Sequence, residues 1–516
     1  MLKRLLTPLL TAAPKAPAAT SARAVHPLAL GPRRGVPAIA AGSMAVALVG
    51  AAGLGSCRST APAEARASLP YDQILEDVRA IGFGAKAEEV VEFAELGLNG
   101  HPTVEIPKVQ LERVTTAVPW PRGLVFADDE LIALARGRHR NSGGVDRDID
   151  DKHGTLFAID PDVTELVVEG ETAGEAVRAN GRVFAEPGDV FNRYEGVLEP
   201  ADDFQMDRPY CTLIWDEVSR NFFICGYSGV DLPGRKFRKN ATDSVHRLDL
   251  RSGQWESVEM HDADVVPQER DRYVVSNEYY PHHDPQANAA PHGWLNGPDG
   301  GCVARDGLFV AAKDNHLVVR YDLTGIREDA AAGAPGGEPV LGPRVTLRLP
   351  SGEQTEVEAL GPSAITYHGD YLYVGYRTSS VVLRYELDER GELVQPPVAE
   401  LVALFTPWDP QVRRSTNLID MAFNAEGELF VSCSSNGLIW KVGHPDPSHP
   451  FRGDTRDGRR ISAEPYLELT EHTGRAGGVG NIVFDEEGRL YFCSGNYDTD
   501  STTLAGVIYR AVPLEQ

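Results

Sequence analysis

The sequence NIVFDEEGRLYF at residues 481–492 decides the fold, because its pattern returns five more times along the chain. Three copies align without a gap: DMAFNAEGELFV (420–431), SAITYHGDYLYV (363–374) and DGGCVARDGLFV (299–310). Two looser copies, RGLVFADDELIAL (122–134) and TLIWDEVSRNFFIC (212–225), differ in the turn. Each copy joins two apolar strands by a turn rich in Asp, Glu, Gly and Asn, which is the pattern of a β-hairpin. Six hairpins in one chain predict a repeat architecture.

Further strands follow each hairpin. Third-strand patterns begin at residues 155, 244, 317, 381, 438 and 507, and a basic residue recurs at one position in five of the six. A fourth strand follows the first five of them, and these candidates are 164–168, 255–259, 344–349, 401–405 and 465–469. Only four residues remain after the last third strand at 507–512, so we expect the strand-like segment 109–115 to complete that blade. A strand contributed by the N-terminus would close a ring and remove exposed sheet edges.

The sequence therefore predicts an all-β fold, a six-bladed β-propeller closed by an N-terminal outer strand, with a short helical N-terminal preface. The propeller spans residues 104–516, with insertions at 170–208 and 262–296. Two alternatives stay open: an open sandwich, and a seven-bladed ring that uses strands within the insertions. Residues 71–98 are expected to be helical, because Ile74, Leu75, Val78 and Ile81 share one face and a second apolar group follows.

The first 57 residues have the pattern of a targeting leader, and residues 58–70 that of a disordered tether. The leader is basic and free of acids, and an apolar run at 36–54 ends in Leu54-Gly55-Ser56-Cys57. This ending resembles a bacterial lipobox, which implies lipidation of Cys57, export, and anchoring at the membrane facing the periplasm or the cell exterior. An uncleaved anchor, a start at Met44 and a twin-arginine signal at Arg33-Arg34 are the alternatives.

The formal net charge of −25 argues against nucleic acid as a partner, because nucleic-acid binding requires a basic surface. After residue 60 no stretch is long and apolar enough to span a membrane, so contact with a membrane is expected only through the lipidated N-terminus. We expect a monomer whose partner is a small molecule or a cell-envelope protein.

Five cysteines follow Cys57. Cys211 and Cys225 are expected opposite each other in a hairpin, where they could form a disulfide. The alternative is that all five are small buried apolar residues.

The residue that opens each repeat is expected at the central channel. This ring consists of Arg122, Thr212, Asp299, Ser363, Asp420 and Asn481. Asp299, Asp420 and Asn481 would present hard oxygen ligands of the kind that Ca²⁺ or another divalent cation prefers. The alternative is a polar channel filled with ordered water.

Loops between second and third strands should open at the same mouth and supply candidate ligand-binding residues. These are Arg136, Lys313, Asn315, Arg377, Asn436 and Asn496, with Asp314 and Asp498 beside them. The three cations could orient a carboxylate or a sugar acid, or they could pair with neighbouring acids. Both insertions should cover this mouth, and the second carries His283 in an aromatic-rich segment that is either a metal or ring-stacking site or a plain lid.

The repeats resemble those of the NHL, regucalcin/gluconolactonase-like and streptogramin-lyase-like propellers. The residues that carry the resemblance are Gly297-Pro298-Asp299-Gly300 and Gly361-Pro362-Ser363, which are similar to the Gly-Pro-x-Gly phrases that open blades in those families. The gluconolactonase-like resemblance implies a divalent metal held by Glu, Asn and Asp at the inner strand starts, activating water or a lactone carbonyl. By position Asp299, Asp420 and Asn481 would fill those roles, but Arg122 opens the first repeat where a glutamate would be expected.

Three functions follow from these patterns. The first is a cell-envelope lipoprotein propeller that binds a small ligand at the channel mouth, with or without a divalent cation. The alternative is a metal-dependent hydrolase or lyase of lactonase-like type, and the second alternative is a protein-interaction scaffold. Fold alone does not choose among them, because function on propellers depends on the residues of the site.

Overall fold

The computed structural model describes 19 segments of the chain, all within one unit, Ala65–Gln516. These segments are 109–135, 154–168, 173–185, 205–207, 210–226, 229–231, 237–239, 244–251, 253–260, 274–276, 297–313, 316–328, 337–349, 352–405, 418–434, 437–443, 463–469, 478–495 and 506–514. The leader, the tether, the helical preface and Cys57 lie outside them, so those predictions stay predictions. Of the helices described, none has the length and apolar character needed to cross a membrane.

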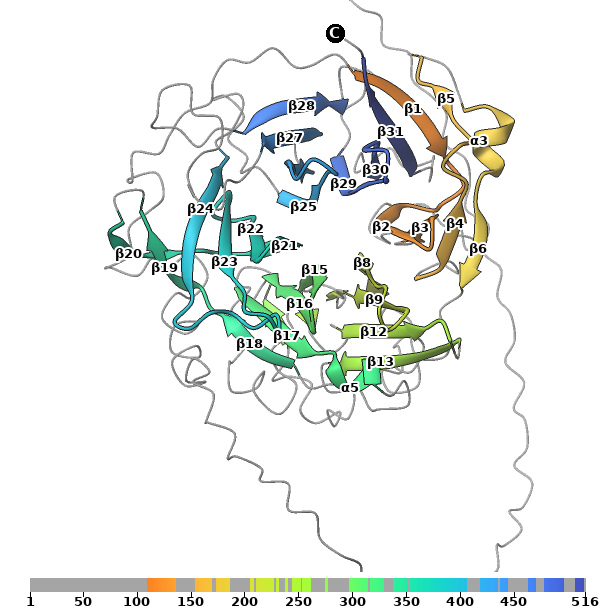
Figure 1. Ribbon diagram of the computed structural model, residues 1–516. Helices are drawn as coiled ribbons and strands as arrows, with labels where there is room; N and C mark the ends of the chain where they lie inside the picture. Colours follow the sequence, from red (N-terminus) through yellow and green to blue (C-terminus); the bar gives the residue numbers. More distant parts are fainter. Residues whose placement is uncertain are drawn as a thin grey trace, which may run out of the picture. The chain divides into compact units, whose positions relative to one another are not determined.

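Six sheets stand around a common centre (Figure 1), which confirms the six-bladed propeller and makes both alternatives wrong. In each sheet the first hairpin strand is innermost. The first blade contains β2 (Pro121–Ala127), β3 (Glu130–Ala135), β4 (Leu156–Ile159) and β6 (Arg182–Ala185). The second contains β8 (Tyr210–Asp216), β9 (Asn221–Gly226), β12 (Ser244–Asp249) and β13 (Gln254–Met260). The third contains β15 (Pro298–Ala304), β16 (Gly307–Ala312), β17 (Leu317–Asp322) and β18 (Gly337–Leu341).

The other three blades include the two that depart from four strands. The fourth contains β21 (Pro362–His368), β22 (Tyr371–Tyr376), β23 (Val381–Glu386) and β24 (Val398–Leu404), followed outward by β19 (Arg344–Arg348) and β20 (Gln354–Glu358). The fifth contains β25 (Leu418–Phe423), β26 (Leu429–Cys433), β27 (Leu438–Gly443) and β28 (Glu464–Glu468). The sixth contains β29 (Gly478–Phe484), β30 (Leu490–Gly495), β31 (Val507–Pro513), β1 (Val109–Thr115) and β5 (Glu165–Leu166).

Short elements lie outside the blade sheets. Two ribbons pair β7 (Gln205–Asp207) with β10 (Gly229–Asp231) and β11 (Phe237–Lys239) with β14 (Val274–Ser276). The helices within the described segments are α3 (Glu175–Ala179) and α5 (Thr324–Glu328). The described part of the first insertion therefore supplies a helix and the outer strand β6 of the first blade, at the periphery of the ring (Figure 1).

The strand that closes the ring is β1, as the sequence predicts. β1 pairs antiparallel with β31, with Glu112 opposite Arg510. The Arg510 Nε donates to the Glu112 carboxylate at 2.8 Å, and both side chains are nearly buried. The N-terminal part of the described chain and its C-terminal strand therefore share one blade, and the ring is closed by backbone pairing and an ion pair.

Two of the predicted fourth strands are wrong. Residues 164–168 form β5, which pairs with β1 in the sixth blade, and the first blade uses β6 instead. Residues 344–349 form β19, which pairs in parallel with β24 of the fourth blade, and the third blade uses β18. In both cases the predicted segment crosses to the outer edge of a neighbouring blade, because that edge offers unpaired backbone groups.

The repeated turn has a physical cause. Asn424 and Asp485 occupy equivalent positions, and each side chain accepts a hydrogen bond from the backbone N–H four residues later, at 2.8 and 2.7 Å. Gly427 and Gly488 adopt φ of 77° and 75° in the same turns, which only glycine does without strain. The Asn/Asp-x-Glu-Gly signature is thus a consequence of the turn geometry.

Apolar clusters fill each interface between successive blades. The interface of the fifth and sixth blades is typical, with Phe430, Ile439, Ile482 and Phe492 all buried. Removing one such side chain from water contributes about 1.5–3 kcal/mol.

The basic residue that recurs in third strands pairs with an acid on the next strand of its blade. Arg384 in the fourth blade pairs with Glu400 at 2.9 Å, and Arg510 in the sixth pairs with Glu112 in the same way.

The side chains of four cysteines are described, and all four are free thiols: Cys225, Cys302, Cys433 and Cys493. Cys225 lies opposite Thr212 in the second hairpin, so the Cys211–Cys225 disulfide is not formed. Three of the four are fully buried, which agrees with the interpretation of small apolar core residues.

Candidate functional site

Every inner strand is irregular at the position where its repeat begins. The pairing of each first hairpin shifts register between Pro121 and Gly123, Tyr210 and Thr212, Pro298 and Gly301, Pro362 and Ala364, Leu418 and Asp420, and Val479 and Ile482. A β-bulge bends its strand and re-aims a side chain. The bulge therefore marks the level at which the six ring residues turn toward the axis.

Contacts between different blades join the ring residues. The Ser363 hydroxyl of the fourth blade donates to the Leu418 carbonyl of the fifth at 2.7 Å. Asp420 of the fifth blade accepts from the Ile482 N–H of the sixth at 3.0 Å. The Asn481 amide of the sixth blade donates to the Thr212 hydroxyl of the second at 3.4 Å, and so joins the two blades that flank the first.

Asp299 is the centre of a cationic cluster. Its carboxylate is 4% exposed and lies 3.8 Å from Arg122, 3.5 Å from Lys313 and 3.8 Å from Arg377. These partners come from the first, third and fourth blades. The exposed fraction of their side chains rises from 6% for Arg122 through 18% for Lys313 to 31% for Arg377, so Arg122 lies deepest and Arg377 nearest the rim.

The backbone holds both rim cations in place. The Lys313 N–H donates to the Gly297 carbonyl at 3.2 Å, and the His316 N–H donates to the Lys313 carbonyl at 3.2 Å. His316 Nδ1 then accepts from the Gly361 N–H at 3.1 Å, and the Gly361 carbonyl accepts from the Arg377 N–H at 2.7 Å. One continuous chain of hydrogen bonds therefore links Lys313 in the third blade to Arg377 in the fourth.

The Gly-Pro phrases have a geometric role in this arrangement. Gly361 adopts φ +66°, and a Cβ there would lie 2.5 Å from the Thr378 hydroxyl. At Gly300, a Cβ would lie 2.2 Å from the Ser363 carbonyl oxygen. Both glycines allow the third and fourth inner strands and their loops to approach closely, which brings Lys313 and Arg377 to the same carboxylate.

Two titratable groups beside the cluster are perturbed. Burial lowers the pKa of His316 to about 4, so its ring is neutral at pH 7 and Nδ1 is the acceptor. Burial also raises the pKa of Asp420 to about 6, against the opposing effects of its hydrogen bonds from Ile482, Met421 and Asn481 and of the positive charge of Arg122.

The three predicted metal ligands lie in different surroundings. Asp420 and Asn481 are hydrogen-bonded to each other, whereas the groups nearest Asp299 are cations. Among the residues that the structure describes, no three His, Cys, Asp or Glu side chains lie together as a metal site. Within the described part of the chain the buried Asn481 Oδ1 has no hydrogen-bond partner and is a hard oxygen donor beside Asp420, but the positive charge of Arg122 opposes a further cation. The described residues do not by themselves fit a divalent ion.

Lys313 and Arg377 are therefore the predicted ligand-binding residues that the structure brings together. Arg136, Asn315, Asn436, Asn496 and His283 lie outside the described residues, and their assignment stays a prediction. His316 and Gly361 were not singled out for the site by the sequence, although the Gly-Pro phrase marks Gly361. No local pattern signals His316, because its partner is 45 residues away.

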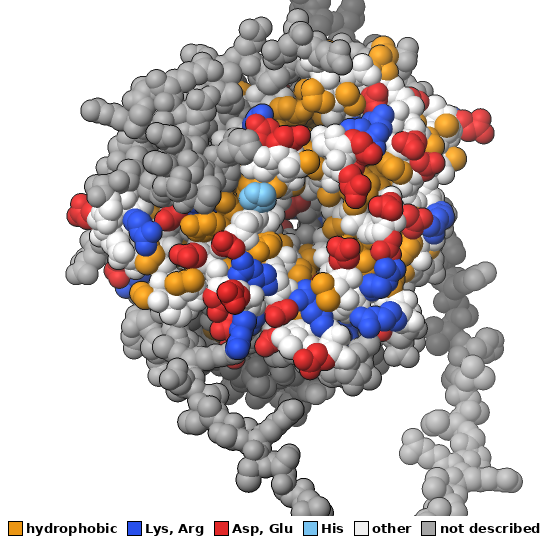
Figure 2. Space-filling view, viewed as in Figure 1, with side chains coloured by type: hydrophobic (Ala, Val, Ile, Leu, Met, Phe, Trp, Pro, Cys, Tyr) orange, Lys and Arg blue, Asp and Glu red, His pale blue; other side chains and the backbone are white. Residues whose placement is uncertain are grey.

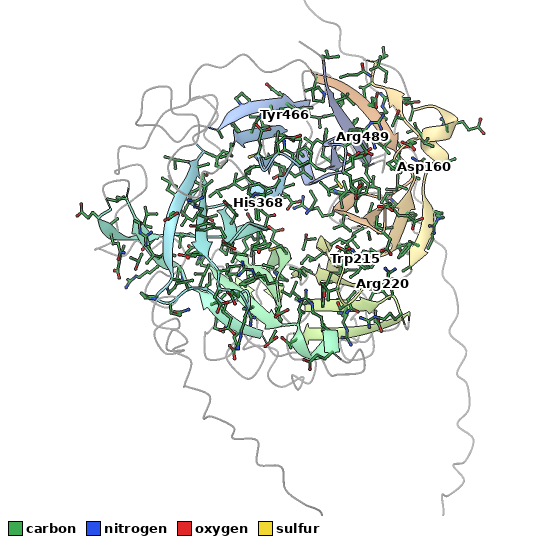
Figure 3. All side chains as sticks on the ribbon, in the orientation of Figure 1. Asp160, Trp215, Arg220, His368, Tyr466 and Arg489 are labelled. Atoms are coloured by element: carbon green, nitrogen blue, oxygen red, sulfur yellow. The ribbon has the colours of Figure 1, made fainter. Side chains whose placement is uncertain are left out.

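The opposite face of the ring carries the hairpin turns. Figure 3 labels His368, the last residue of β21, near the centre of the view, and Figure 2 shows that face with acidic and basic side chains intermingled. His368 stacks on Phe423 of the next blade at 4.3 Å between ring centroids. This face has a structural explanation in interblade stacking, so the candidate site lies at the other end of the channel.

The fold and the site define the class of the protein: a six-bladed β-propeller with a charged cluster at one end of its channel. No family model and no curated protein matches the chain. Solved structures of the same fold do match, among them regucalcin, a calcium-binding protein from Agrobacterium tumefaciens, at 10% identity over 80% of this chain and 97% of that one, with a TM-score of 0.39.

Two further solved structures that match are a gluconolactonase and a lyase. A gluconolactonase from Xanthomonas campestris is 11% identical over 82% of this chain and 94% of its own, with a TM-score of 0.37. Virginiamycin B lyase from Staphylococcus aureus is 11% identical over 79% and 99%, with a TM-score of 0.36. Similarity at this level concerns the fold alone.

Proposed function

We propose that the protein is a ligand-binding propeller whose channel mouth binds a small molecule that carries a carboxylate, such as a sugar acid. The observation that carries the proposal is the convergence of Lys313 and Arg377, from adjacent blades, on the single carboxylate of Asp299. Arg122 adds a third positive charge below them. The three cations meet two carboxylates, because Arg122 also acts on Asp420, and the site keeps a net positive charge on a chain whose formal net charge is −25.

The chemistry of the two rim residues suits such a ligand. An arginine presents parallel N–H donors to a carboxylate, and a lysine adds a point charge, and hydrogen bonds between charged groups are about twice as strong as neutral ones. The distances of 3.5 and 3.8 Å from Asp299 are those of ion pairs rather than of short charged hydrogen bonds. A ligand carboxylate that approaches from the rim would meet Arg377 first and Lys313 next.

Asp299 supports specificity in this proposal. Buried under the two cations, it fixes their direction and limits the net positive charge, so that a single carboxylate is preferred over a more highly charged anion. The metal-dependent hydrolase, the first alternative, is less favoured because the groups around Asp299 are cations. For the scaffold alternative, the described channel offers no specific argument.

Export and lipidation belong to the same proposal but depend on the leader alone. We infer from Leu54-Gly55-Ser56-Cys57 that the propeller is carried on an exported lipoprotein. Metabolic labelling with a palmitate analogue in a bacterial host tests this inference. Wild-type protein should incorporate the label, and Cys57→Ser should not; labelling of both variants, or of neither, would reject Cys57 as the lipidated residue.

Isothermal titration calorimetry against a panel of sugar acids and simple carboxylates, each paired with its amide or alcohol analogue, tests the binding function. The acids should bind and their neutral analogues should bind at least about tenfold more weakly, because each charged hydrogen bond contributes about 1.5–3 kcal/mol. Lys313→Met and Arg377→Met should each weaken binding about tenfold or more. The matched control is Arg220→Met, which removes an exposed arginine from the Asp128 pair at the opposite end of the hairpins.

A preference for neutral or cationic ligands, or equal affinity in Arg377→Met and Arg220→Met, would reject the proposal. Addition of Ca²⁺ and of a chelator to the same titrations tests the cation requirement. Binding that is unchanged by either supports the site as described; binding that is lost with the chelator would instead favour the metal-dependent alternative.

A further inference from the structure

Exposed apolar side chains gather at one corner of the closing blade. Among the described residues, six large apolar side chains are strongly exposed, and three of them belong to the strands of the sixth blade or directly follow them. Leu166 in β5 is 54% exposed, Val168 just beyond it is 42% exposed, and Leu514 after β31 is 46% exposed. Isolated exposed apolar residues are ordinary, but a group at one place marks an interaction surface.

The strand register puts these side chains on one face. Glu112 of β1 pairs with Leu166 on one side and with Arg510 on the other. Two residues along β1 in the direction of Val109, Gln110 pairs with Val512, and continuation of the same register brings Val168 beside it. Because side chains alternate across a strand, Leu166, Val168, Val512 and Leu514 point to the same side of the sheet.

The opposite face of the same strands belongs to the core. Leu111, Val109 and Ala511 are buried there, and Val167 packs against the apolar cluster between the fifth and sixth blades. We call the outward-facing group the corner patch and define it as Leu166, Val168, Val512 and Leu514; Val512 is half-buried and the other three are exposed. Gln110 and Glu112 of the middle strand β1 lie between the two apolar pairs on the same face, so the patch is apolar at both sides of a polar strand.

The chain enters the propeller beside this patch. Val109, the first residue of β1, pairs with Pro513, the last residue of β31, and Leu514 is the next residue. Figure 1 shows β1, β31 and β5 next to each other at the outside of the ring, close to the C-terminus. Any segment that precedes residue 109 thus leaves the propeller at the corner patch.

The segment in question is amphipathic by sequence. Residues 71–98 carry Ile74, Leu75, Val78 and Ile81 at helical spacing, and Val90, Val91 and Phe93 follow. An amphipathic helix needs an apolar surface on which to bury one face. Residues 99–108 connect it to β1, and ten residues of extended chain span at most about 33–36 Å, which is enough to place the helix on the patch.

We propose that residues 71–98 dock on the corner patch and cover the outer corner of the closing blade. A segment of the same chain is favoured over a second copy, because a short linker gives an effective concentration in the millimolar range. A group of four side chains is also small beside the roughly 800 Å² that each partner of a stable dimer buries. Docking would protect the strands that close the ring, at the point where the lipid-linked tether would pull on it.

Hydrogen exchange read by mass spectrometry tests the proposal on the mature chain from residue 58. Three proteins are compared with it: a chain that begins at residue 104, Ile74→Asp/Val78→Asp, and Leu166→Asp/Leu514→Asp. Peptides that cover β5 and the end of β31 should exchange at least about tenfold faster in the first two variants. Peptides from residues 71–98 should exchange at least about tenfold faster in the third.

Val218→Asp/Val394→Asp is the matched control, since both residues are exposed valines away from the patch, and it should change neither region. Cooperative thermal unfolding of every variant verifies that the propeller is intact, because each substitution lies on an exposed side chain or outside the described strands. Unchanged exchange in all three variants would overturn the proposal. So would patch protection that persists in the chain from residue 104 and grows with protein concentration, which would identify a second copy as the occupant.

Discussion

The Arg122 guanidinium of the first blade lies 3.8 Å from the Asp299 carboxylate of the third, and both side chains are almost fully buried. These two residues open their repeats at equivalent positions, yet their blades are not neighbours in the ring. The ion pair therefore joins the two blades that flank the second blade, and the hydrogen bond from Asn481 to Thr212 joins the two blades that flank the first. Side chains at the repeat starts connect the blades through the channel, in addition to the apolar clusters between them.

Replacement of Arg122 should destabilise the whole ring. In Arg122→Met the buried Asp299 keeps Lys313 and Arg377 but loses its deepest partner, and we expect a loss of about 2–4 kcal/mol in the free energy of unfolding. Urea denaturation measures it. Arg220→Met, which breaks an ion pair that is about half exposed, should cost no more than about 0.5 kcal/mol. Equal effects of the two substitutions would contradict the cross-channel role.

Loss of the closing strand should prevent stable folding. A chain that begins at residue 117 lacks β1, so the edge of β31 and the Arg510 side chain lose their partners. We expect aggregation or non-cooperative unfolding, because an uncovered strand edge pairs with other chains. The chain that begins at residue 104 retains β1 and should unfold cooperatively in circular dichroism. A cooperative transition in the shorter chain would show that closure does not depend on β1.

Asp420 should make the protein less stable as the pH rises. Its pKa in the folded state is about 6, above the model-peptide value of 3.8, so the folded protein binds the proton more tightly than the unfolded chain. Stability is therefore highest below about pH 4 for this group and falls as the pH rises toward 6, by at most about 3 kcal/mol. Asp420→Asn should be more stable than wild type at pH 7 but not at pH 4, measured by urea denaturation at both values. Greater destabilisation of this variant at pH 7 than at pH 4 would contradict the prediction.

His316 should make the protein less stable as the pH falls, which is the opposite of the effect of Asp420. Its folded pKa of about 4 lies below the ordinary value of 6.5, so stability is present above pH 6.5 and is lost as the pH falls toward 4. His316→Asn should remove this dependence, because the Asn oxygen can accept from Gly361 N–H and Asn tolerates the φ of 59°. His316→Ala leaves that buried N–H without its acceptor and should cost about 1–3 kcal/mol at pH 7.

Ligand affinity distinguishes a positioning role of His316 from a purely structural one. His316→Asn should bind the carboxylate ligand within about threefold of wild type at pH 7. His316→Ala should bind it more weakly than His316→Asn does, because it breaks the hydrogen-bond chain that links Lys313 to Arg377. Equal affinity in both variants, with only stability changed, would mean that the hydrogen-bond chain from Lys313 to Arg377 does not position the cations.

Much of the fold could be predicted from the sequence because its information is local. Each hairpin has its own turn chemistry, exemplified by Asn424 and Asp485, and the shortage of residues after β31 indicated the closing role of β1. The pairing of the outer strands was harder to predict from the sequence. β5 pairs over two residues only, and β19 joins the fourth blade in parallel, so their positions depend on which neighbouring edge is free.

The site was predicted in part for the same reason. Alignment of the repeats identified all six ring residues, and loop position identified Lys313 and Arg377. It could not show that Arg122 neutralises Asp299 across the channel, because no spacing relates blades that are not adjacent. That ion pair is one reason why we propose an anion site in place of the expected cation site, and only the three-dimensional arrangement reveals it.

Anomalous diffraction from two soaked crystals tests the central claim most directly. One crystal of the mature protein is soaked in bromide and the other in manganese. We predict a bromide peak between the Lys313 ammonium and the Arg377 guanidinium, absent in crystals of Arg377→Met, and no manganese peak at the ring. A manganese peak that joins Asp299, Asp420 and Asn481, with no bromide between Lys313 and Arg377, would contradict the account and restore the metal-dependent interpretation.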